Sequence, residues 1–336
     1  MNIEGMTSPF ETYILEKAAK LNRTIVLPEA YLNDDVVEAG IICANNKIAK
    51  IVLLVDSDDV KNRFNIVESE YLKLENIKTS DLKPMLASAL YVKRKEKGVT
   101  EQKAAELIEN PVYFATMMVE LGLVDGMACG TIFTSADSIR PALQIIKGKT
   151  KESLISSYFI AISENKNFGD NGVMLLADCG INMNPSKEEL VEICFETVKS
   201  ARNIAGIEPR VAMLSYSTMG SAEGEGAIKM REATALIKAQ NPDFVIDGEL
   251  QFDAAVSTKV AQRKAPNSEV KGNATVFIFP NLECGNIAYK VMQRFAGFKV
   301  IGPLCQGFRK PINDMSRGAD TNEIIRAVAI TALQCE

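Results

Sequence analysis

The chain has 336 residues, 47% of them hydrophobic and 24% charged, which is ordinary for a globular protein long enough to form two domains. Its net charge of −5 argues against a nucleic-acid partner, because such proteins need a basic face to neutralise phosphates. No apolar run approaches the roughly 18–20 residues that span a bilayer, and the acidic N-terminus lacks the apolar stretch of a signal peptide.

The cysteine and histidine content restricts the chemistry further. There are seven cysteines without a CxxC pair, and there is no histidine. An odd number of scattered cysteines is typical of reduced thiols, so we expect a cytoplasmic protein without a disulfide framework. A structural zinc site is not expected, because both usual ligand types are missing or dispersed.

Strand and helix patterns alternate along the first part of the chain. Short apolar runs predict a strand followed by a turn at 24–30, a strand at 50–55, and a strand leading into a glycine loop at 122–130. Amphipathic patterns predict helices at 34–46 and 135–146. The polar stretch 147–153 is the expected domain boundary, and we interpret it as a hinge because the chain has no long linker.

The same alternation continues to the C-terminus. Apolar runs predict strands at 154–162, 172–179, 210–217, 243–250, 274–280 and 299–304. Periodic patterns predict helices at 184–206, 223–240, 285–297 and 322–334. Such alternation indicates an α/β protein with mainly parallel sheets covered on both faces. Ligands are then expected at the carboxyl ends of the strands.

The loop 129–140, CGTIFTSADSIR, is one candidate ligand site. It enters a helix through Thr134, Ser135 and Asp137, and a helix N-terminus offers free N–H groups to an anion such as phosphate. Arg140 follows one turn later and could close a phosphate clamp. Ordinary capping with a surface arginine explains the same residues, and both interpretations stay open.

Three later features have structural explanations that compete with functional ones. The turn 215–229 fails both the Walker and the dinucleotide patterns, although it could line a cleft. Asp247, Glu249 and Asp253 could bind magnesium, but turn formation and helix capping by Asp253 are favoured. Cys179 has no histidine to activate it, so a structural or cleft-lining thiol is favoured over a nucleophile.

The stretch 310–324, KPINDMSRGADTNEI, is polar although apolar segments flank it. Few of its side chains are expected to form a core, so we ask what chemistry it concentrates. Asp320 at the N-cap and Glu323 at the N3 position predict a capping box for the last helix.

Five stretches, in the same order, together resemble the phosphate acetyltransferases of the phosphate acetyl/butyryl transferase family over nearly the whole chain. They are VDGMACGTIFTSADSIRPALQ, MLSYSTMGSA, DGELQFDAAV, NATVFIFPNLECGNIAYKVMQRF and IGPLCQGFRKPINDMSRGA. The resemblance implies reversible conversion of acetyl-CoA and phosphate into acetyl phosphate and CoA. CoA is then a substrate, and no tightly bound cofactor or metal is implied.

The resemblance also implies an architecture. We expect two α/β domains with an active-site cleft between them, a fold related to isocitrate and isopropylmalate dehydrogenases, and a homodimer. The first domain is expected to comprise 1–150 and 306–336, and the second, inserted into it, 151–305.

The resemblance assigns several site residues. Ser316 and Arg317 are carried over as catalytic or substrate-binding, and the family's other functional arginines match Arg94 and Arg140. Glu323 stands where relatives place an aspartate considered the general base. By position in these motifs, three further residues are expected to bind acetyl phosphate: Thr134, Ser135 and Asn313. Phe133 stands where relatives often have histidine, so a histidine there is not essential to this chain's chemistry.

The implied chemistry suits these side chains. Arginines can hold a phosphate bidentately, and a hydroxyl such as that of Ser316 can donate to an oxyanion. Lys290 and Arg294 fall on one face of a predicted helix, where they could bind the CoA diphosphate or form a solvated stripe. The alternatives are a butyryltransferase, a non-catalytic acyl-CoA-sensing module and a fold-related dehydrogenase, the last without a nicotinamide fingerprint.

Overall fold

The computed structural model describes residues 3–6, 8–148, 150 and 153–335, apart from the side chain of Ser135. The chain forms two compact units, unit 1 (Met1–Lys151 and Phe308–Glu336) and unit 2 (Glu152–Gly307). The predicted boundary 147–153 is described only in part, because 149, 151 and 152 lie outside the described residues. Within the described part of the chain, no helix is long and apolar enough to cross a bilayer.

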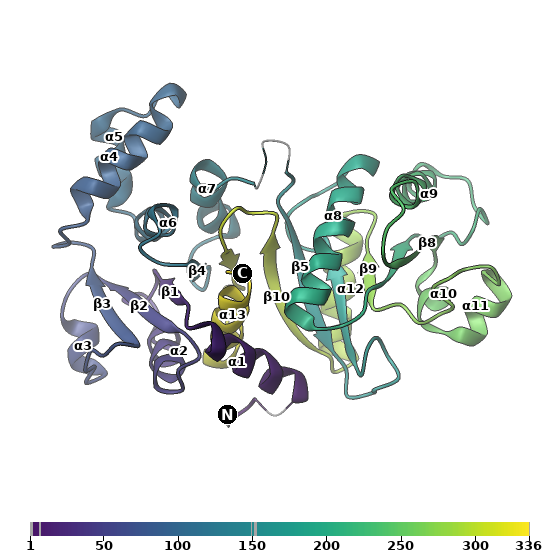
Figure 1. The fold of residues 1–336 in the computed structure, drawn as a ribbon, viewed down its shortest axis with the longest axis horizontal. Coiled ribbons are helices and arrows are strands. Elements are labelled where there is room, and N and C mark those ends of the chain that lie inside the picture. Colours follow the sequence, from purple (N-terminus) through teal and green to yellow (C-terminus); the bar gives the residue numbers. More distant parts are fainter. Residues whose placement is uncertain (1–2, 7, 149, 151–152, 336) are drawn as a thin grey trace. The chain divides into compact units, whose positions relative to one another are not determined.

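Unit 1 is built on a five-stranded sheet in the order β11-β4-β1-β2-β3, in which all neighbours are parallel (Figure 1). The strands are β1 (Thr24–Leu27), β2 (Lys50–Val55), β3 (Leu72–Asn76), β4 (Gly126–Cys129) and β11 (Ile312–Asp314). The strands predicted near residues 24, 50 and 126 are confirmed. Short apolar runs signal them because strands of a parallel sheet are buried on both faces.

Helices cover both faces of this sheet (Figure 1). The C-terminal helix, Thr321–Leu333, packs on β1 and β4 beside the helices Pro9–Leu21 and Asp34–Asn45. The helix Pro111–Leu121 packs on β4, and the helix Ser135–Ile145 packs on β11. The helices are α1 (Pro9–Leu21), α2 (Asp34–Asn45), α3 (Asp59–Arg63), α4 (Lys83–Arg94), α5 (Glu101–Ile108), α6 (Pro111–Leu121), α7 (Ser135–Ile145) and α13 (Thr321–Leu333), with a 3₁₀ turn at Lys95–Lys97.

Strand β11 lies inside the polar stretch 310–324. The expectation that few of these side chains form a core is wrong here, because Ile312, Asn313 and Asp314 are all buried. β11 pairs with β4 in parallel, and Asp314 is in register with Cys129. Polar residues can be buried in this way when neighbouring elements satisfy their hydrogen bonds. The C-terminal segment therefore completes the sheet of unit 1.

Unit 2 has a six-stranded sheet in the order β10-β5-β6-β9-β7-β8. β10 and β6 run antiparallel to β5, and the remaining pairs are parallel, so the prediction of mainly parallel sheets is confirmed. The strands are β5 (Ser156–Ile162), β6 (Val173–Ala177), β7 (Arg210–Leu214), β8 (Val245–Leu250), β9 (Val276–Ile278) and β10 (Lys299–Gln306).

The three helices predicted in unit 2 are confirmed, and two short helices between residues 252 and 264 were not predicted. The helix predicted at 184–206 is α-helical only to Ser200, and a π-helical turn then runs to Ala205. The Phe159 ring of β5 stacks on the Tyr289 ring of the helix Leu282–Phe295, with ring centroids 4.1 Å apart. The helices are α8 (Lys187–Ser200), α9 (Glu225–Lys238), α10 (Phe252–Val256), α11 (Thr258–Lys264) and α12 (Leu282–Phe295).

Candidate functional site

The loops after β4 and β11 meet at the carboxyl edge of the unit 1 sheet. Because these strands are parallel neighbours, their carboxyl ends lie at the same edge. The Met315 N–H donates to the Cys129 carbonyl over 2.7 Å, and the Gly318 N–H donates to the Thr131 carbonyl over 3.3 Å. Ser316 and Arg317, both exposed, therefore lie beside the loop that begins at residue 130.

That loop already binds an anion, which is the carboxylate of Glu29. The N–H groups of Gly130 and Thr131 donate to Glu29 over 2.9 Å, and those of Ile132 and Phe133 over 3.0 and 3.2 Å. The Thr131 hydroxyl adds a fifth bond of 2.9 Å. Glu29 is only 1% exposed. The loop amides at 130–133 are therefore engaged by the chain itself and are not available to a phosphate.

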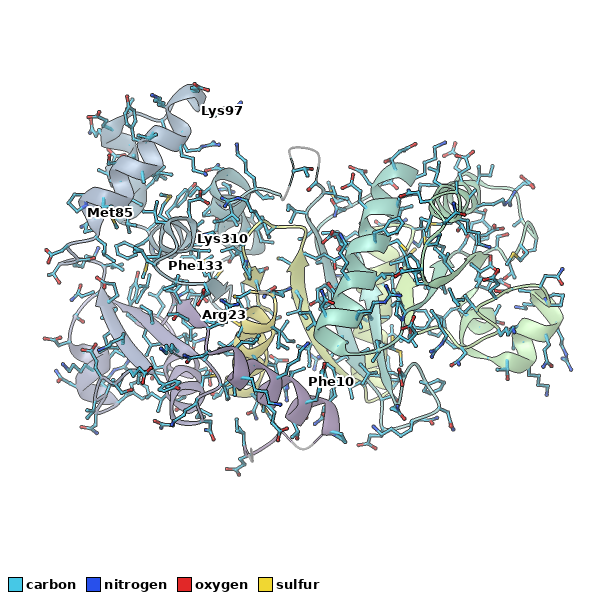
Figure 2. All side chains as sticks on the ribbon, viewed as in Figure 1. Phe10, Arg23, Met85, Lys97, Phe133 and Lys310 are labelled. Carbon is cyan, nitrogen blue, oxygen red and sulfur yellow. The ribbon has the colours of Figure 1, made fainter. Side chains whose placement is uncertain are left out.

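Gly130 is needed at this point for its conformation. Its φ is +110°, a backbone conformation that is strained for any residue with a side chain. A Cβ there would collide with Asp314 Oδ1 and lie 2.7 Å from the Met315 nitrogen. The glycine thus allows the two loops to approach closely. Phe133, labelled in Figure 2, follows in the same loop and has no ring nitrogen that could transfer a proton.

Thr134 acts as the N-cap of α7. Its hydroxyl accepts from the Asp137 N–H over 3.2 Å and donates to Asp137 Oδ2 over 2.8 Å. Asp137 also pairs with Arg140 over 3.3 Å, and the Arg140 side chain is 57% exposed. Ser135 is the first residue of α7, but its side chain lies outside the described part of the chain. The capping interpretation is therefore confirmed for Thr134, while Arg140 stays accessible.

Arg94 and Arg140 are 46 positions apart in the sequence, but both lie near enough to Tyr113 of α6 for their charges to lower its pKa. The Tyr113 hydroxyl donates to Gln144 Oε1 over 2.9 Å, and Arg94 Nη1 donates to the Gln144 carbonyl over 3.3 Å. Burial raises the pKa of Tyr113, and the charges of Arg140 and Arg94 oppose that rise. Arg94 Nε is buried with no hydrogen-bond partner among the described residues. The two arginines predicted to bind phosphate thus share one neighbourhood.

Tyr113 and Gln144 were not predicted from the sequence. Tyr113 lies in the apolar helix PVYFATMMVEL, where an aromatic residue is expected in the core. Glu29 was not predicted either, because the amides it binds lie about a hundred residues further along the chain. Its only signal is a carboxylate placed directly after a buried strand.

Asn313 has a structural position. Its side chain is fully buried, and Nδ2 donates to Thr331 Oγ1 over 2.8 Å and to Gln334 Oε1 over 2.6 Å. Both amide hydrogens are therefore used to hold β11 against α13 and its C-cap residue. This position does not support the predicted contact between Asn313 and acetyl phosphate.

The capping box of α13 is confirmed. The Glu323 N–H donates to Asp320 Oδ1 over 2.7 Å, and the Asp320 N–H donates to Glu323 Oε2 over 3.3 Å. Glu323 is half-buried, so its carboxylate is neither core nor fully solvated. A role for Glu323 as general base stays a prediction.

In unit 2, the three carboxylates proposed for magnesium each have another role. Asp247 pairs with Lys238 over 2.7 Å, and Asp253 pairs with Lys264 over 2.8 Å. Asp253 is not the cap of α10, because that helix begins at Phe252 and its N-cap is Gln251. In the described residues no group of three His, Cys, Asp or Glu could hold a metal ion. Asp247 lies inside β8 and Asp253 inside α10, so ion pairing rather than turn formation explains both.

Glu249 organises the turn that follows β7. Its carboxylate accepts from the Ser217 hydroxyl over 2.9 Å and from the Gly220 N–H over 2.7 Å, and it pairs with Arg231 over 3.1 Å. Burial raises the pKa of Glu249, but the bonds from Arg231 and Gly220 outweigh it and hold the pKa below its usual value. A charged carboxylate is therefore a fixed part of this turn.

The remaining predicted residues of unit 2 differ in exposure. Cys179 is fully buried, and burial together with the charge of Asp178 raises its pKa well above the usual value, which suits a structural thiol. Lys290 and Arg294 are exposed on α12, and the Lys290 ammonium lies 5.1 Å from the centroid of the Tyr289 ring. Their role in binding CoA stays a prediction.

Comparisons with known proteins agree with the resemblance seen in the sequence. The model of the phosphate acetyl/butaryl transferase family matches residues 9–332. The phosphate acetyltransferase of Clostridium acetobutylicum is 42% identical over 325 residues, which are 96% of this chain and 97% of that protein. A phosphotransacetylase structure from Streptococcus pyogenes has a TM-score of 0.90 at 38% identity, covering 100% of this chain and 99% of that one.

A more distant structure shows the wider fold group. It is a putative 4-hydroxythreonine-4-phosphate dehydrogenase from Salmonella typhimurium, with a TM-score of 0.54 at 11% identity over 94% of this chain and 99% of that one. At this identity the likeness concerns the fold alone, and it agrees with the expected dehydrogenase-like architecture. The match along nearly the whole chain and the close agreement in structure lead to one conclusion: the chain belongs to the phosphate acetyl/butaryl transferase family.

Proposed function

We propose that the protein is a phosphate acetyltransferase, which transfers an acetyl group reversibly between CoA and phosphate. Family membership supports this activity. The structural observation that carries it is the placement of Arg94 and Arg140 around Tyr113, with Arg94 Nε buried and without a partner among the described residues. A buried guanidinium N–H without a partner is costly, and a bound phosphate oxygen would satisfy it.

The proposed reaction is a direct transfer within a ternary complex. The CoA thiolate attacks the carbonyl carbon of acetyl phosphate, a carbon–sulfur bond forms, and the carbon–oxygen bond to phosphate breaks. Arg94 and Arg140 hold the departing phosphate and neutralise its charge. The Ser316 hydroxyl donates to the developing oxyanion, and Arg317 beside it stabilises negative charge. Thr134 and Ser135 place the start of α7 near the phosphate.

We propose Glu323 as the acceptor of the thiol proton. An ordinary glutamate near pKa 4.3 and a thiol near 8.5 differ by about 4 units, so complete proton transfer costs about 5.7 kcal/mol. Transfer therefore requires that the positive charge of Arg317 lower the pKa of the thiol, or that the bound substrates exclude water from Glu323. CoA is a substrate in this scheme, and its diphosphate is assigned to Lys290 and Arg294.

We also propose a homodimer, formed through α12. Ile287, Val291 and Phe295 recur every four residues on one face of this helix, and they are 63%, 49% and 90% exposed. An exposed apolar stripe of this kind is typical of a protein interface. A cytoplasmic location stays a prediction that rests on the number and spacing of the cysteines.

The activity is tested by mixing the purified protein with acetyl phosphate and CoA and following the thioester by its ultraviolet absorbance. We expect acetyl-CoA to form at the same rate with and without a metal chelator, and without added NAD. The same assay with propionyl and butyryl phosphate measures the acyl-chain preference. No thioester from any of the three acyl phosphates would overturn the proposed function.

A further inference from the structure

The two arginines proposed to bind phosphate belong to different helices of unit 1, and a third helix lies between these two (Figure 1). Arg94 is the last residue of α4, Arg140 lies in α7, and α6 packs against both of these helices. Two guanidinium groups can hold one phosphate only if their spacing is right. The bonds that join the three helices therefore matter for binding, and two of them meet at one residue, Gln144.

Gln144 is bonded to both of the other helices. Its backbone carbonyl accepts from Arg94 Nη1 of α4 over 3.3 Å, and its side-chain Oε1 accepts from the Tyr113 hydroxyl of α6 over 2.9 Å. Gln144 follows Arg140 by four positions on α7, so the two side chains lie on the same face of that helix. The charges of Arg140 and Arg94 both act on Tyr113. The side chain of Gln144 thus lies in the neighbourhood that the two arginines share.

The bond from Tyr113 decides which end of the Gln144 amide is left for a ligand. A carboxamide has one oxygen that accepts hydrogen bonds and an NH₂ group that donates two. Because the Tyr113 hydroxyl donates to the oxygen, the NH₂ group is directed away from that hydroxyl. Gln144 is half-buried, and its NH₂ group has no hydrogen-bond partner among the described residues. Two donors with a fixed direction are therefore available to an acceptor.

The guanidinium of Arg94 also has a donor left over. Its Nη1 is engaged by the Gln144 carbonyl, whereas its buried Nε has no hydrogen-bond partner in the described part of the chain. Arg140 pairs with Asp137 over 3.3 Å, and its side chain is 57% exposed. A phosphate group has several acceptor oxygens, and it can accept from two guanidinium groups and an amide at the same time.

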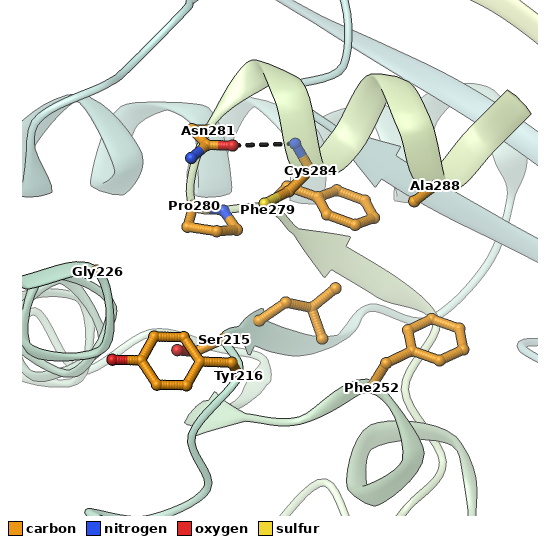
Figure 3. Close-up of a pocket in the computed structure, with 10 residues that line it drawn as sticks. Ser215, Tyr216, Gly226, Phe252, Phe279, Pro280, Asn281, Cys284 and Ala288 are labelled. Atoms are coloured by element: carbon orange, nitrogen blue, oxygen red, sulfur yellow. Dashed lines mark hydrogen bonds between the residues drawn. The ribbon is translucent and has the colours of Figure 1, made fainter. Parts of the chain in front are cut away.

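A cavity of about 400 Å³ in unit 2 offers phosphate no comparable set of donors (Figure 3). It has an amide side chain, that of Asn281, whose Oδ1 caps α12 by accepting from the Cys284 N–H over 3.0 Å. None of the described residues that line this cavity is Lys or Arg, and the rings of Tyr216, Phe252 and Phe279 form part of the wall. Burying a phosphate against such a wall is unfavourable. The combination of an amide with two arginines is a feature of unit 1.

We propose that the Gln144 NH₂ group binds the phosphate of acetyl phosphate, and that Tyr113 is a positioning residue that directs this group to the substrate. The inference rests on the proposed function, which assigns the phosphate to Arg94 and Arg140, and it adds an uncharged ligand to that site. Because the Tyr113 hydroxyl already holds the amide, little side-chain entropy is lost when the substrate binds.

Two variants of Gln144 separate binding from packing. Gln144→Met has a side chain of similar length without the amide, so it loses both the NH₂ group and the bond to Tyr113. Gln144→Glu keeps an acceptor for Tyr113 but replaces the NH₂ group with an oxygen that repels phosphate. Isothermal titration calorimetry with inorganic phosphate measures the result. We expect the Kd to rise about 10- to 150-fold in Gln144→Met, the effect of one hydrogen bond to a charged group, and to rise further in Gln144→Glu.

Tyr113→Phe tests the positioning role. Phenylalanine keeps the ring but no longer holds the amide, so the Kd for phosphate and the KM for acetyl phosphate should each rise about 2- to 12-fold. The KM for CoA should stay the same. In a Gln144→Met background the same change should have no further effect, because Tyr113 acts through Gln144. Tyr71→Phe is the matched control, since Tyr71 is also a half-buried tyrosine of unit 1, and it should behave like the wild type.

Several outcomes would contradict the assignment. Wild-type affinity for phosphate in Gln144→Met would exclude the amide as a ligand, even if Gln144→Glu bound phosphate weakly, because an added charge also acts at a distance. A smaller loss in Gln144→Glu than in Gln144→Met would mean that Gln144 only packs the helices. An equal effect of Tyr113→Phe in both backgrounds would remove the positioning role. Failure of the proposed function is a separate result, in which calorimetry shows the expected losses but no acetyl-CoA forms.

Discussion

At the scale of single residues, the proposed binding of phosphate by the arginines of unit 1 gives the most specific prediction. Arg140→Lys keeps the charge but loses the planar fork that binds phosphate bidentately. We expect kcat/KM for acetyl phosphate to fall about 10- to 100-fold. The Tm should not change, because Arg140 is exposed and its ion pair with Asp137 lies at the surface. Steady-state kinetics and thermal unfolding check both values.

The matched control is Arg63→Lys. Arg63 is also an exposed arginine of unit 1, and it pairs with Asp34 and Asp59 over 2.9 and 2.8 Å. Wild-type kinetics are expected for this control. If Arg140→Lys behaves like Arg63→Lys, then Arg140 is an ordinary surface residue and the phosphate assignment fails.

Substitution of Glu323 tests whether this capping residue also acts as the general base. Glutamine is as suitable as glutamate at the N3 position of a capping box, so Glu323→Gln should preserve the cap and the Tm. Loss of a general base lowers turnover about 100- to 10,000-fold, and we expect this loss in kcat. Glu323→Asp, with a shorter side chain, should retain part of the activity.

The control for this experiment is Glu189→Gln, which changes the N3 residue of the capping box of α8. Glu189 is half-buried like Glu323, but it lies in unit 2 and has no proposed role in the reaction. Both glutamine variants should unfold at nearly the wild-type temperature. Normal turnover by Glu323→Gln would show that this carboxylate is only a cap.

At the scale of elements, the contact between β11 and α13 decides where the loop that carries Ser316 and Arg317 begins. Asn313→Ala removes both hydrogen bonds from β11 to the C-terminal part of α13 and its cap. Buried groups left without partners cost about 1–3 kcal/mol each. We expect urea denaturation to show a loss of this size, with the KM for acetyl phosphate unchanged. A raised KM in a protein of normal stability would instead return Asn313 to the substrate site.

The same elements show what the sequence can and cannot predict. Strand β6 was predictable because all its residues, from Val173 to Ala177, are apolar and buried. β11 was not, since it has three residues and two of them are polar. Its burial depends on partners in β4 and α13 that only the folded chain brings together. The capping box of Glu323 was predictable because it joins residues three positions apart. The contacts of Glu29 and Tyr113 were not, because their partners are distant in the sequence.

At the scale of the whole molecule, the exposed stripe on α12 predicts a dimer. Phe295→Asp places a charge at its most exposed apolar position, and burying an unpaired charge in an interface is unfavourable. We expect light scattering to show a shift from dimer to monomer. Val67→Asp is the control, because Val67 is 84% exposed on unit 1 and outside the stripe. A wild-type monomer, or a dimer unaffected by Phe295→Asp, would remove α12 from the interface.

The contact between Glu29 and the loop after β4 has a consequence for substrate affinity. In a loop that is disordered in the free protein, the backbone must become ordered when the ligand binds, at a cost of about 1–2 kcal/mol per residue. Here an internal carboxylate holds residues 130–133 before any substrate arrives. The entropy of ordering is thus lost during folding rather than at each catalytic cycle. If Ser316 and Arg317 act on the substrate as proposed, the neighbouring loop is ordered in advance, and binding energy remains available for the transition state.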